Sequence, residues 1–480
     1  MVKVREVFEK IMKNLKFYNT LSRELEEFKA IEPPLVGLYT CGPTVYNYAH
    51  LGNLRTYLFE DWLKRVLLYA DYEVKHIMNV TDVGHLVGDG DLGEDKMELG
   101  SAREGRSAWE IADYYWQAFR DDLKMLNIAE PTQWAKVTDN IPEQIELIKL
   151  LEKKGFTYLT PDGLYFDTVK FPDYNKLSHL HLEDLIEGAR VEKNIAKKNP
   201  TDFALWKFSP AGKKRQMEWK SPWGLGFPGW HIECSAIALK YLGQNQDIHC
   251  GGIDHINVHH TNEIAQSEAA TGKKFFNYWL HGAFLNIVGG KKMAKSAGNF
   301  LTLKNSLIEK KINPLAFRLA AASVHYRKPM EYSEASLRQA ENTWRNLLRQ
   351  VAALPETPGK INSAWQESFF QAIADDLNLP QALAVTQDLL KSNLTEADKL
   401  ATVLDFDRVL GFSLAKAKEL ADREISLEEL APEIKELVLA REQARTNHDF
   451  TTSDRLREEL RQRGYAVEDL KGGVKIITLD

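Results

Sequence analysis

Two thiols, an imidazole and a carboxylate are the residues in this sequence whose types best suit metal binding. His259 and Glu263 lie four residues apart in a segment with a helical pattern, so both side chains project from one helix face. Cys41 ends an apolar segment, and Cys234 lies in the segment Trp-His-Ile-Glu-Cys. Two thiolates, one imidazole and one carboxylate would complete a tetrahedral zinc site. Because Cys41 and Cys234 lie far apart in the sequence, their spacing leaves open that they are ordinary buried thiols.

Two further motifs carry groups that suit phosphate binding. In the turn His-Leu-Gly-Asn, Gly52 removes a side chain where a helical pattern begins, and His50 and Asn53 offer hydrogen-bond donors there. In the segment Lys-Met-Ala-Lys-Ser, Lys292 and Lys295 suit a loop that neutralises phosphates. Taken singly, the first motif has an ordinary interpretation as a helix cap and the second as a solvated charge run. Their occurrence in one chain favours a nucleotide site.

The elements around the first motif predict an α/β fold. A short apolar strand is expected over 36–40, and a second strand, rich in β-branched residues, over 72–80. Between them, Leu54, Leu58 and Trp62 recur on one face of a helical pattern. Strand, glycine-bearing turn, helix and strand form a βαβ unit, which implies a parallel sheet with a nucleotide-type site at the turn.

The rest of the chain alternates between helical and irregular patterns. Residues 105–155 are expected to be helical, 156–230 to form short strands and loops, and 231–270 to form helix, strand and helix. Beyond 303 the chain is mostly helical, with Ser333 as the N-cap of a long amphipathic helix. The last 50 residues suggest a helical hairpin, its second helix capped by Thr452 or Ser453, followed by a strand over 474–478.

Length, net charge and composition indicate what broad class of protein this is. The chain has 480 residues, a net charge of −6 and 44% hydrophobic residues, which is typical of a globular protein with several domains. Three cysteines cannot form a disulfide framework and fit a reducing compartment. No stretch approaches the ~18–20 apolar residues that span a bilayer, and the N-terminus lacks the apolar region of a secretory signal. We therefore expect a soluble, cytoplasmic protein.

Residues 190–220 form a locally basic stretch. It holds nine Lys or Arg residues against three acids, and tryptophans and phenylalanines are interleaved with them. Such a stretch suits a nucleic-acid backbone with stacking surfaces for bases. The alternative is a solvated loop whose aromatic side chains belong to a core.

These motifs, in their order along the chain, resemble those of the cysteinyl-tRNA synthetase family, which belongs to the class I aminoacyl-tRNA synthetases. Residues 41–53 are similar to the HIGH-motif segment of that family, 229–236 to a zinc-ligand segment, and 259–267 to its HHENEIAQS helix. Residues 292–296 resemble its KMSKS loop, with Ala294 in place of the first serine, and 440–457 resemble its C-terminal helices. The resemblance covers nearly the whole chain.

The resemblance implies roles for particular residues. It implies zinc bound by Cys41, Cys234, His259 and Glu263. It also implies Mg-ATP bound by His50, Gly52, Asn53, Lys292 and Lys295, of which His50, Lys292 and Lys295 act in catalysis. The substrate cysteine would lie among Thr81, Trp230, His249 and Asp254.

The resemblance further implies an α/β fold in which a Rossmann-type parallel-sheet catalytic domain is split by a connective insertion. A helical bundle and a small C-terminal α/β domain follow. The expected boundaries are an N-terminal extension at 1–15, the catalytic halves at 16–140 and 229–290, the insertion at 141–228, the KMSKS loop and stem-contact region at 291–332, the anticodon-side bundle at 333–425 and an anticodon-binding domain at 426–480.

The activity that the resemblance implies is that of a cysteine–tRNA ligase, with tRNA(Cys), L-cysteine and ATP as partners, no membrane contact and a monomeric state. Zinc would separate cysteine from serine, since it binds a thiolate whereas a serine hydroxyl is a far weaker acid. Two alternatives stay open. One is a synthetase-like ligase that joins activated cysteine to a small-molecule amine, and the other is a non-catalytic RNA-binding or zinc-structural module.

Overall fold

The structure is a computed structural model. It describes residues 14–84, 95–179, 197–210, 212, 215–287, 300–421, 424–425, 427–470 and 473–478. The lysine-bearing segment 292–296, residues 1–13 of the N-terminal extension and residues 190–196, 211, 213 and 214 of the basic stretch lie outside the described residues.

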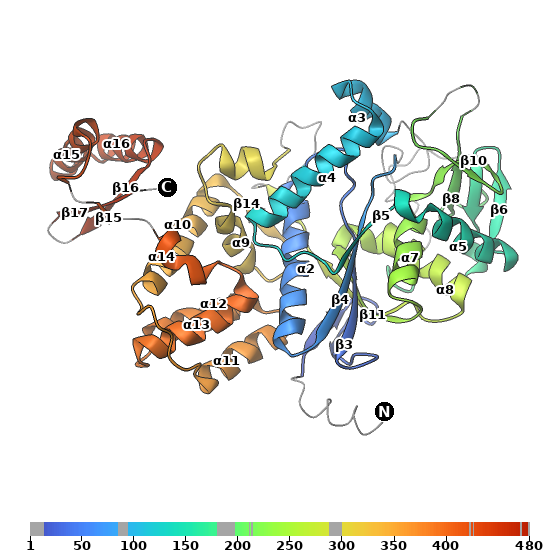
Figure 1. Ribbon diagram of the computed structural model, residues 1–480, viewed down its shortest axis with the longest axis horizontal. Helices are drawn as coiled ribbons and strands as arrows, with labels where there is room; N and C mark the ends of the chain where they lie inside the picture. The colour runs from blue at the N-terminus through green and yellow to red at the C-terminus, as the bar shows by residue number, and fades with distance from the viewer. Residues whose placement is uncertain are drawn as a thin grey trace.

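A five-stranded parallel sheet forms the centre of the molecule (Figure 1). Its strand order is β12-β11-β3-β4-β5, and every neighbouring pair is parallel. The strands are β3 (Leu35–Thr40), β4 (Glu73–Val80), β5 (Gln133–Lys136), β11 (Gln246–Gly252) and β12 (Phe276–Gly282). The predicted α/β class, the two predicted strands and their parallel pairing are therefore confirmed.

Helices cover both faces of this sheet. On one face lies α2 (Leu51–Tyr69), whose side chains Leu54, Leu58 and Trp62 pack into a core shared with the helices that follow. The other face is covered by α7 (Trp230–Tyr241) and α8 (Thr261–Thr271), as Figure 1 shows. Alternate residues of each strand point to opposite faces, so a strand end can supply one side chain to the α2 core and the next to the α7–α8 side.

An antiparallel sheet with the order β6-β7-β8-β10-β9 lies between β5 and α7 in the chain. This region and the helices before it consist of α3 (Lys96–Glu104), α4 (Ala108–Met125), α5 (Ile141–Lys153), β6 (Thr157–Thr160), β7 (Gly163–Phe166), a short helix over Thr168–Lys170, β8 (Phe203–Phe208), β9 (Trp219–Ser221) and β10 (Gly224–Pro228). Phe203 and Trp206 are buried in its core. These two aromatic side chains therefore belong to a core, and the interpretation of them as stacking surfaces is wrong.

One strand was missed by the helical interpretation of 105–155. Residues Gln133–Lys136 form β5, which pairs in parallel with β4. Four residues are too short to show a period of two, and β5 exists because β4 offers it hydrogen bonds at the sheet edge. Pairing with β4, and not the sequence pattern of these four residues, determines that they form a strand.

The second half of the chain is mainly helical. Its elements are β13 (Leu285–Ile287), a single turn over Lys304–Ile308, α9 (Pro314–Ala322), β14 (Met330–Tyr332), α10 (Glu334–Ala352), α11 (Ser363–Ala374), α12 (Leu379–Lys391), α13 (Glu396–Leu410) and α14 (Ala417–Leu420). Ser333 caps α10 as predicted, since its hydroxyl accepts from the backbone N–H of Ser336. At the other end of the chain, β1 (Lys16–Asn19) and β2 (Glu24–Glu27) form a hairpin.

The C-terminal unit has a core of its own. It contains β15 (Glu424–Ile425), α15 (Pro432–Thr446), α16 (Phe450–Gln462), β16 (Tyr465–Leu470) and β17 (Gly473–Thr478), and Figure 1 shows it beyond α10. The predicted hairpin and final strand are confirmed. The predicted cap is wrong, because α16 begins earlier and Asp449 accepts the hydrogen bond from the Thr452 backbone. Aspartate is favoured over threonine at the N-cap of a helix. No described helix is long and apolar enough to cross a bilayer.

A buried ion pair joins α2 to the helical half of the chain. Arg318 of α9 has no exposed surface, and its Nη2 lies 2.5 Å from Oδ2 of Asp61 on α2. Its Nε donates to the carbonyl of Leu410, at the end of α13. Burial by itself would raise the pKa of Asp61, but the charges of Arg318 and Arg65 hold that pKa below its usual value. The pair therefore keeps both charges inside the protein.

We expect the substitution Arg318→Met to destabilise the protein by about 3–5 kcal/mol, because it leaves the Asp61 carboxylate buried with less compensation. The measurement is the urea midpoint of unfolding. The matched control is Arg120→Met, which removes an exposed pair with Glu130 and should cost about 0–1 kcal/mol. Equal midpoints for the two variants would contradict the role given to Arg318.

Candidate active site

The candidate site lies at the carboxyl edge of the parallel sheet. Cys41 directly follows β3, Thr81 directly follows β4, and β11 ends at Gly252. In open α/β sheets this edge is where ligands bind. Cys234 on α7 and Glu263 on α8 reach the same place from the helices that cover the adjoining face.

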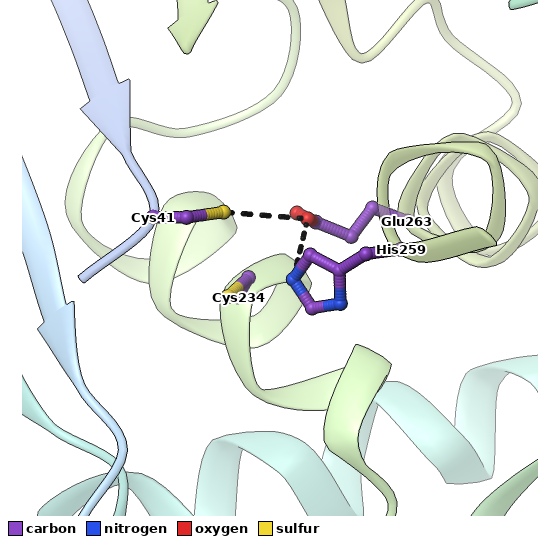
Figure 2. A group of neighbouring side chains, drawn as sticks. All are labelled: Cys41, Cys234, His259 and Glu263. Carbon is purple, nitrogen blue, oxygen red and sulfur yellow. Dashed lines mark hydrogen bonds and ion pairs between the residues drawn. The ribbon is translucent and has the colours of Figure 1, made fainter. Parts of the chain in front are cut away.

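Figure 2 shows the four predicted metal ligands converging on one point. One donor atom from each of Cys41, Cys234, His259 and Glu263 lies within 4.8 Å of the others. Nε2 of His259 is 3.1 Å from Oε1 of Glu263, and Sγ of Cys41 is 4.0 Å from the same oxygen. All four side chains are buried. The sequence spacing could not show this convergence, because the residues come from the end of β3, from α7, from the π-helical turn Ile256–His260 and from α8.

The donor set fits a zinc ion. Burial, followed by the contact with Cys234, raises the pKa of the Cys41 thiol well above its usual value. Contact with Cys41 lowers the pKa of Cys234, but burial and the charge of Glu263 outweigh it, so this pKa is also raised. A buried cation reverses such shifts, because a coordinated thiol is deprotonated. Two sulfurs, one nitrogen and one oxygen are ligands that zinc accepts in tetrahedral sites.

More histidines surround this group than the sequence analysis identified. His260 lies with Nε2 at 3.3 Å from Sγ of Cys41 and Nδ1 at 2.8 Å from Nε2 of His281. Nδ1 of His231 is 3.0 Å from Nδ1 of His259. Burial and then the charge of His249 lower the pKa of His260 well below its usual value, so its imidazole is neutral. Sequence signals existed for two of these residues, since His260 adjoins His259 and His231 stands three residues before Cys234.

The four residues predicted to surround the substrate cysteine fall into two groups. His249 and Trp230 contact the candidate metal ligands. Nε2 of His249 is 3.1 Å from Oε2 of Glu263, and the Trp230 ring stacks on His259 with centroids 4.3 Å apart. The other two have different surroundings. The Thr81 hydroxyl donates to Glu233, and Asp254 is exposed in a short helix (Ile253–His255) after β11.

The predicted phosphate-binding turn forms the start of α2. His50 is the N-cap, and its Nδ1 accepts from the backbone N–H of Asn53 at 3.0 Å, while the Asn53 side chain accepts from the His50 backbone. The turn therefore caps the helix, which was the ordinary interpretation of this motif. Capping does not exclude ligand binding, because a helix N-terminus also attracts anions. Since Nδ1 accepts, a neutral His50 carries its proton on Nε2.

Lys292 and Lys295 lie outside the described residues, but the described chain resumes beside the His50 turn. The Phe300 ring meets the His50 ring edge-on at 5.7 Å. The Leu51 backbone donates to the carbonyl of Leu301 at 2.8 Å, and Thr302 forms a bridge with His50. The segment that follows the lysines is thus anchored at the start of α2.

Comparison with known proteins agrees with this arrangement. Residues 27–342 match the model of the class I (C) tRNA synthetase catalytic domain, and 427–476 match the cysteinyl-tRNA ligase anticodon binding domain. The chain belongs to the cysteinyl-tRNA synthetase family. Cysteine–tRNA ligase 1 of Burkholderia lata is 47% identical over 462 residues, which is 96% of each chain. The cysteine–tRNA ligase of Treponema denticola is 42% identical and covers 96% of this chain and 98% of its own length.

Solved structures show the same fold at low identity. The methionyl-tRNA synthetase of Mycobacterium tuberculosis in complex with methionyl-adenylate has a TM-score of 0.55 and 16% identity, and it covers 84% of this chain and 95% of its own length. This chain thus shares its fold with that synthetase.

We expect Cys234→Ala to lose bound zinc, because it removes one of four ligands that converge on one point. The loss in affinity should exceed the ~10–100-fold change that follows from mutating outer-shell partners of metal ligands. Metal analysis of the purified protein checks this. The control is Cys250→Ala, since Cys250 is also buried but packs in the α2 core and should retain the metal. Similar zinc contents in both variants would show that Cys234 is not a ligand.

Proposed function

We propose that this chain activates L-cysteine with ATP to cysteinyl-adenylate and transfers the cysteinyl group to the 3′-terminal adenosine of tRNA(Cys). The observation that carries the proposal is the convergence of two thiols, an imidazole and a carboxylate at the carboxyl edge of a synthetase-type sheet. A donor set of this kind suits a substrate that is itself a thiol.

Selection of cysteine over serine has to be made by chemistry, because the two amino acids differ by one atom. A pocket that tests shape alone separates such near-isosteres by only about 1–3 kcal/mol. Zinc held by Cys41, Cys234, His259 and Glu263 would take the substrate sulfur as a thiolate and would bind a serine hydroxyl poorly. The Trp230 ring stacked on His259 and the His249 contact to Glu263 hold two of these ligands in place.

The ATP side of the site belongs to the start of α2. We assign Nε2 of His50, the backbone at Gly52 and the Asn53 side chain to ATP, at the positively polarised end of the helix. Lys292 and Lys295 then neutralise the charge that develops on the leaving pyrophosphate while the cysteine carboxylate attacks the α-phosphorus in line. The anchoring of residues 300–302 beside His50 supports this placement of the lysine loop.

The C-terminal unit favours tRNA over a small amine as the acceptor. Residues 427–476 match an anticodon-binding domain, and a ligase that modified a small molecule would have no anticodon to read. Within the unit, Arg441 of α15 is buried and pairs with Asp469, and the partly exposed Arg445 pairs with the same carboxylate. Arg445 is therefore held in place before any RNA arrives.

We expect cysteine-dependent ATP–pyrophosphate exchange that serine does not support. A site built around a thiolate–metal bond should reject the hydroxyl analogue by about 10⁴-fold or more in kcat/KM, as sites that bind a specific polar group do. Exchange of radiolabelled pyrophosphate, measured with cysteine, serine and alanine, tests this. A zinc-loaded protein that shows no exchange with cysteine would contradict the proposal, and so would comparable rates with serine.

We also expect deletion of residues 422–480 to separate the two steps. The deleted unit has its own hydrophobic core, so the exchange rate should stay within about twofold. Charging of tRNA(Cys) should fall by at least about 10–100-fold, which is the value of a single lost base contact. The measurement compares tRNA charging by the full chain and by the shortened chain. Thermal unfolding of both proteins is the control for folding. Undiminished charging would favour an acceptor that needs no anticodon.

A further inference from the structure

His255 lies in the wall of the metal site, although neither the motifs nor the predicted ligand set includes it. It stands one turn before His259, at the end of the short helix Ile253–His255. Its ring centroid is 5.2 Å from that of His259 and 5.0 Å from that of His260. The Trp230 ring meets it edge-on at 6.3 Å. His255 therefore belongs to the same wall of rings as a candidate metal ligand, yet it is not one of the metal-binding groups of the described residues.

The two ring nitrogens of His255 have different surroundings. Nδ1 is buried and has no hydrogen-bond partner among the described residues. It packs against Gly251, where an added Cβ would lie only 2.7 Å from it. The absence of a side chain at residue 251 is what lets the ring approach β11 so closely. The His255 side chain as a whole is partly exposed, so its accessible surface belongs to its other atoms.

This asymmetry selects one tautomer of the imidazole. A buried N–H without a partner is rarer and costs more than a buried acceptor without one. The neutral ring therefore leaves Nδ1 unprotonated against Gly251 and carries its proton on Nε2. His255 then presents an N–H donor on the edge of the ring that faces away from the strand.

The covalent structure of cysteine limits where its carboxylate can lie. Only two carbon atoms separate the thiol sulfur from the carboxylate carbon, so a cysteine held by its sulfur at the metal keeps its carboxylate among the nearest residues. That carboxylate must also point toward the start of α2, where the ATP side of the site lies. The end of β11 lies close to this helix, since a Cβ on Gly252 would lie 2.4 Å from Oδ1 of Asp254 and 3.8 Å from Oγ1 of Thr56, in the second turn of α2. His255 directly follows Asp254 in the chain.

We propose that His255 is a further substrate-binding residue, whose Nε2–H donates a hydrogen bond to the α-carboxylate of the bound cysteine. The inference rests on the proposed function, because it assumes that cysteine binds through its sulfur at the metal. The hydrogen bond orients the carboxylate toward ATP and offsets the repulsion that the exposed Asp254 carboxylate beside it would exert. The rings of Trp230 and His259 and the backbone at Gly251 pack against the His255 ring and hold it in place.

The test uses the full-length, zinc-loaded protein and three thiols. L-Cysteine has both charged groups, 3-mercaptopropionate has the carboxylate without the amine, and cysteamine has the amine without the carboxylate. His255→Phe keeps a ring but removes the donor, whereas His255→Gln keeps a donor near the position of Nε2. Calorimetry gives the affinity for L-cysteine, and competition against L-cysteine in pyrophosphate exchange gives the inhibition constants of the two analogues.

The expected pattern depends on the carboxylate. In His255→Phe, binding of L-cysteine and 3-mercaptopropionate should weaken by about 10–100-fold, the size of a hydrogen bond to a charged group. Cysteamine should bind within about twofold of its affinity for the unchanged protein. His255→Gln should recover most of the loss, and zinc content should be the same in all three proteins, because His255 is not a ligand.

Two outcomes would overturn the role of His255. One is an equal loss for cysteamine and L-cysteine, which would mean that the substitution disturbs the metal site as a whole. The other is an unchanged affinity for L-cysteine. Neither touches the proposed function, which fails only if the unchanged protein shows no cysteine-dependent exchange. The two failures are thus distinguished by the behaviour of the unchanged protein.

Discussion

A carboxylate with no exposed surface lies at the centre of this molecule, and its charge has to be compensated. Glu263 is fully buried on α8, and an isolated ionised carboxylate in such a place costs several kcal/mol. Its two oxygens face different partners. Oε1 faces His259 and Cys41, while Oε2 faces His249. A zinc ion beside Oε1 would neutralise the carboxylate and a thiolate at once, so the same residue that makes the site costly to fold also makes it suitable for a cation.

The sheet makes this compensation possible. β3 and β11 are parallel neighbours, so their carboxyl ends lie side by side, and the backbone N–H of Cys41 donates to the carbonyl of Cys250 at 3.3 Å. On β11 the alternation of side chains then divides two successive residues. His249 faces Glu263 on the α7–α8 side, and Cys250 faces the α2 core. Three cysteines that look alike in the sequence therefore have two different surroundings, and only two of them reach the candidate metal site.

Local patterns predicted the parts of the fold that local physics decides. The strand before Cys41, the helix after His50 and the strand after it follow from hydrophobic periodicity, and the cap at Ser333 follows from side-chain chemistry. β5 escaped prediction because it exists only through its pairing with β4. The convergence of Cys41 and Cys234 escaped for a similar reason, since no spacing within the chain encodes which helix covers which strand end. Their assignment came from the family resemblance, and the geometry gives it a physical basis.

The two halves of the site are held by different means. The candidate metal side is made of buried side chains whose positions are fixed by the sheet, α7 and α8, so it is set before any substrate binds. The proposed ATP side is made of a helix start whose capping bonds use the backbone, with the segment after Lys295 anchored beside it through Leu301 and Thr302. If cysteine is held at the metal side and ATP at the start of α2, the cysteine must reach from one side to the other for its carboxylate to react with ATP. His255 stands where the fixed half ends, and its tautomer, set by close packing on Gly251, directs a donor toward the group that has to react.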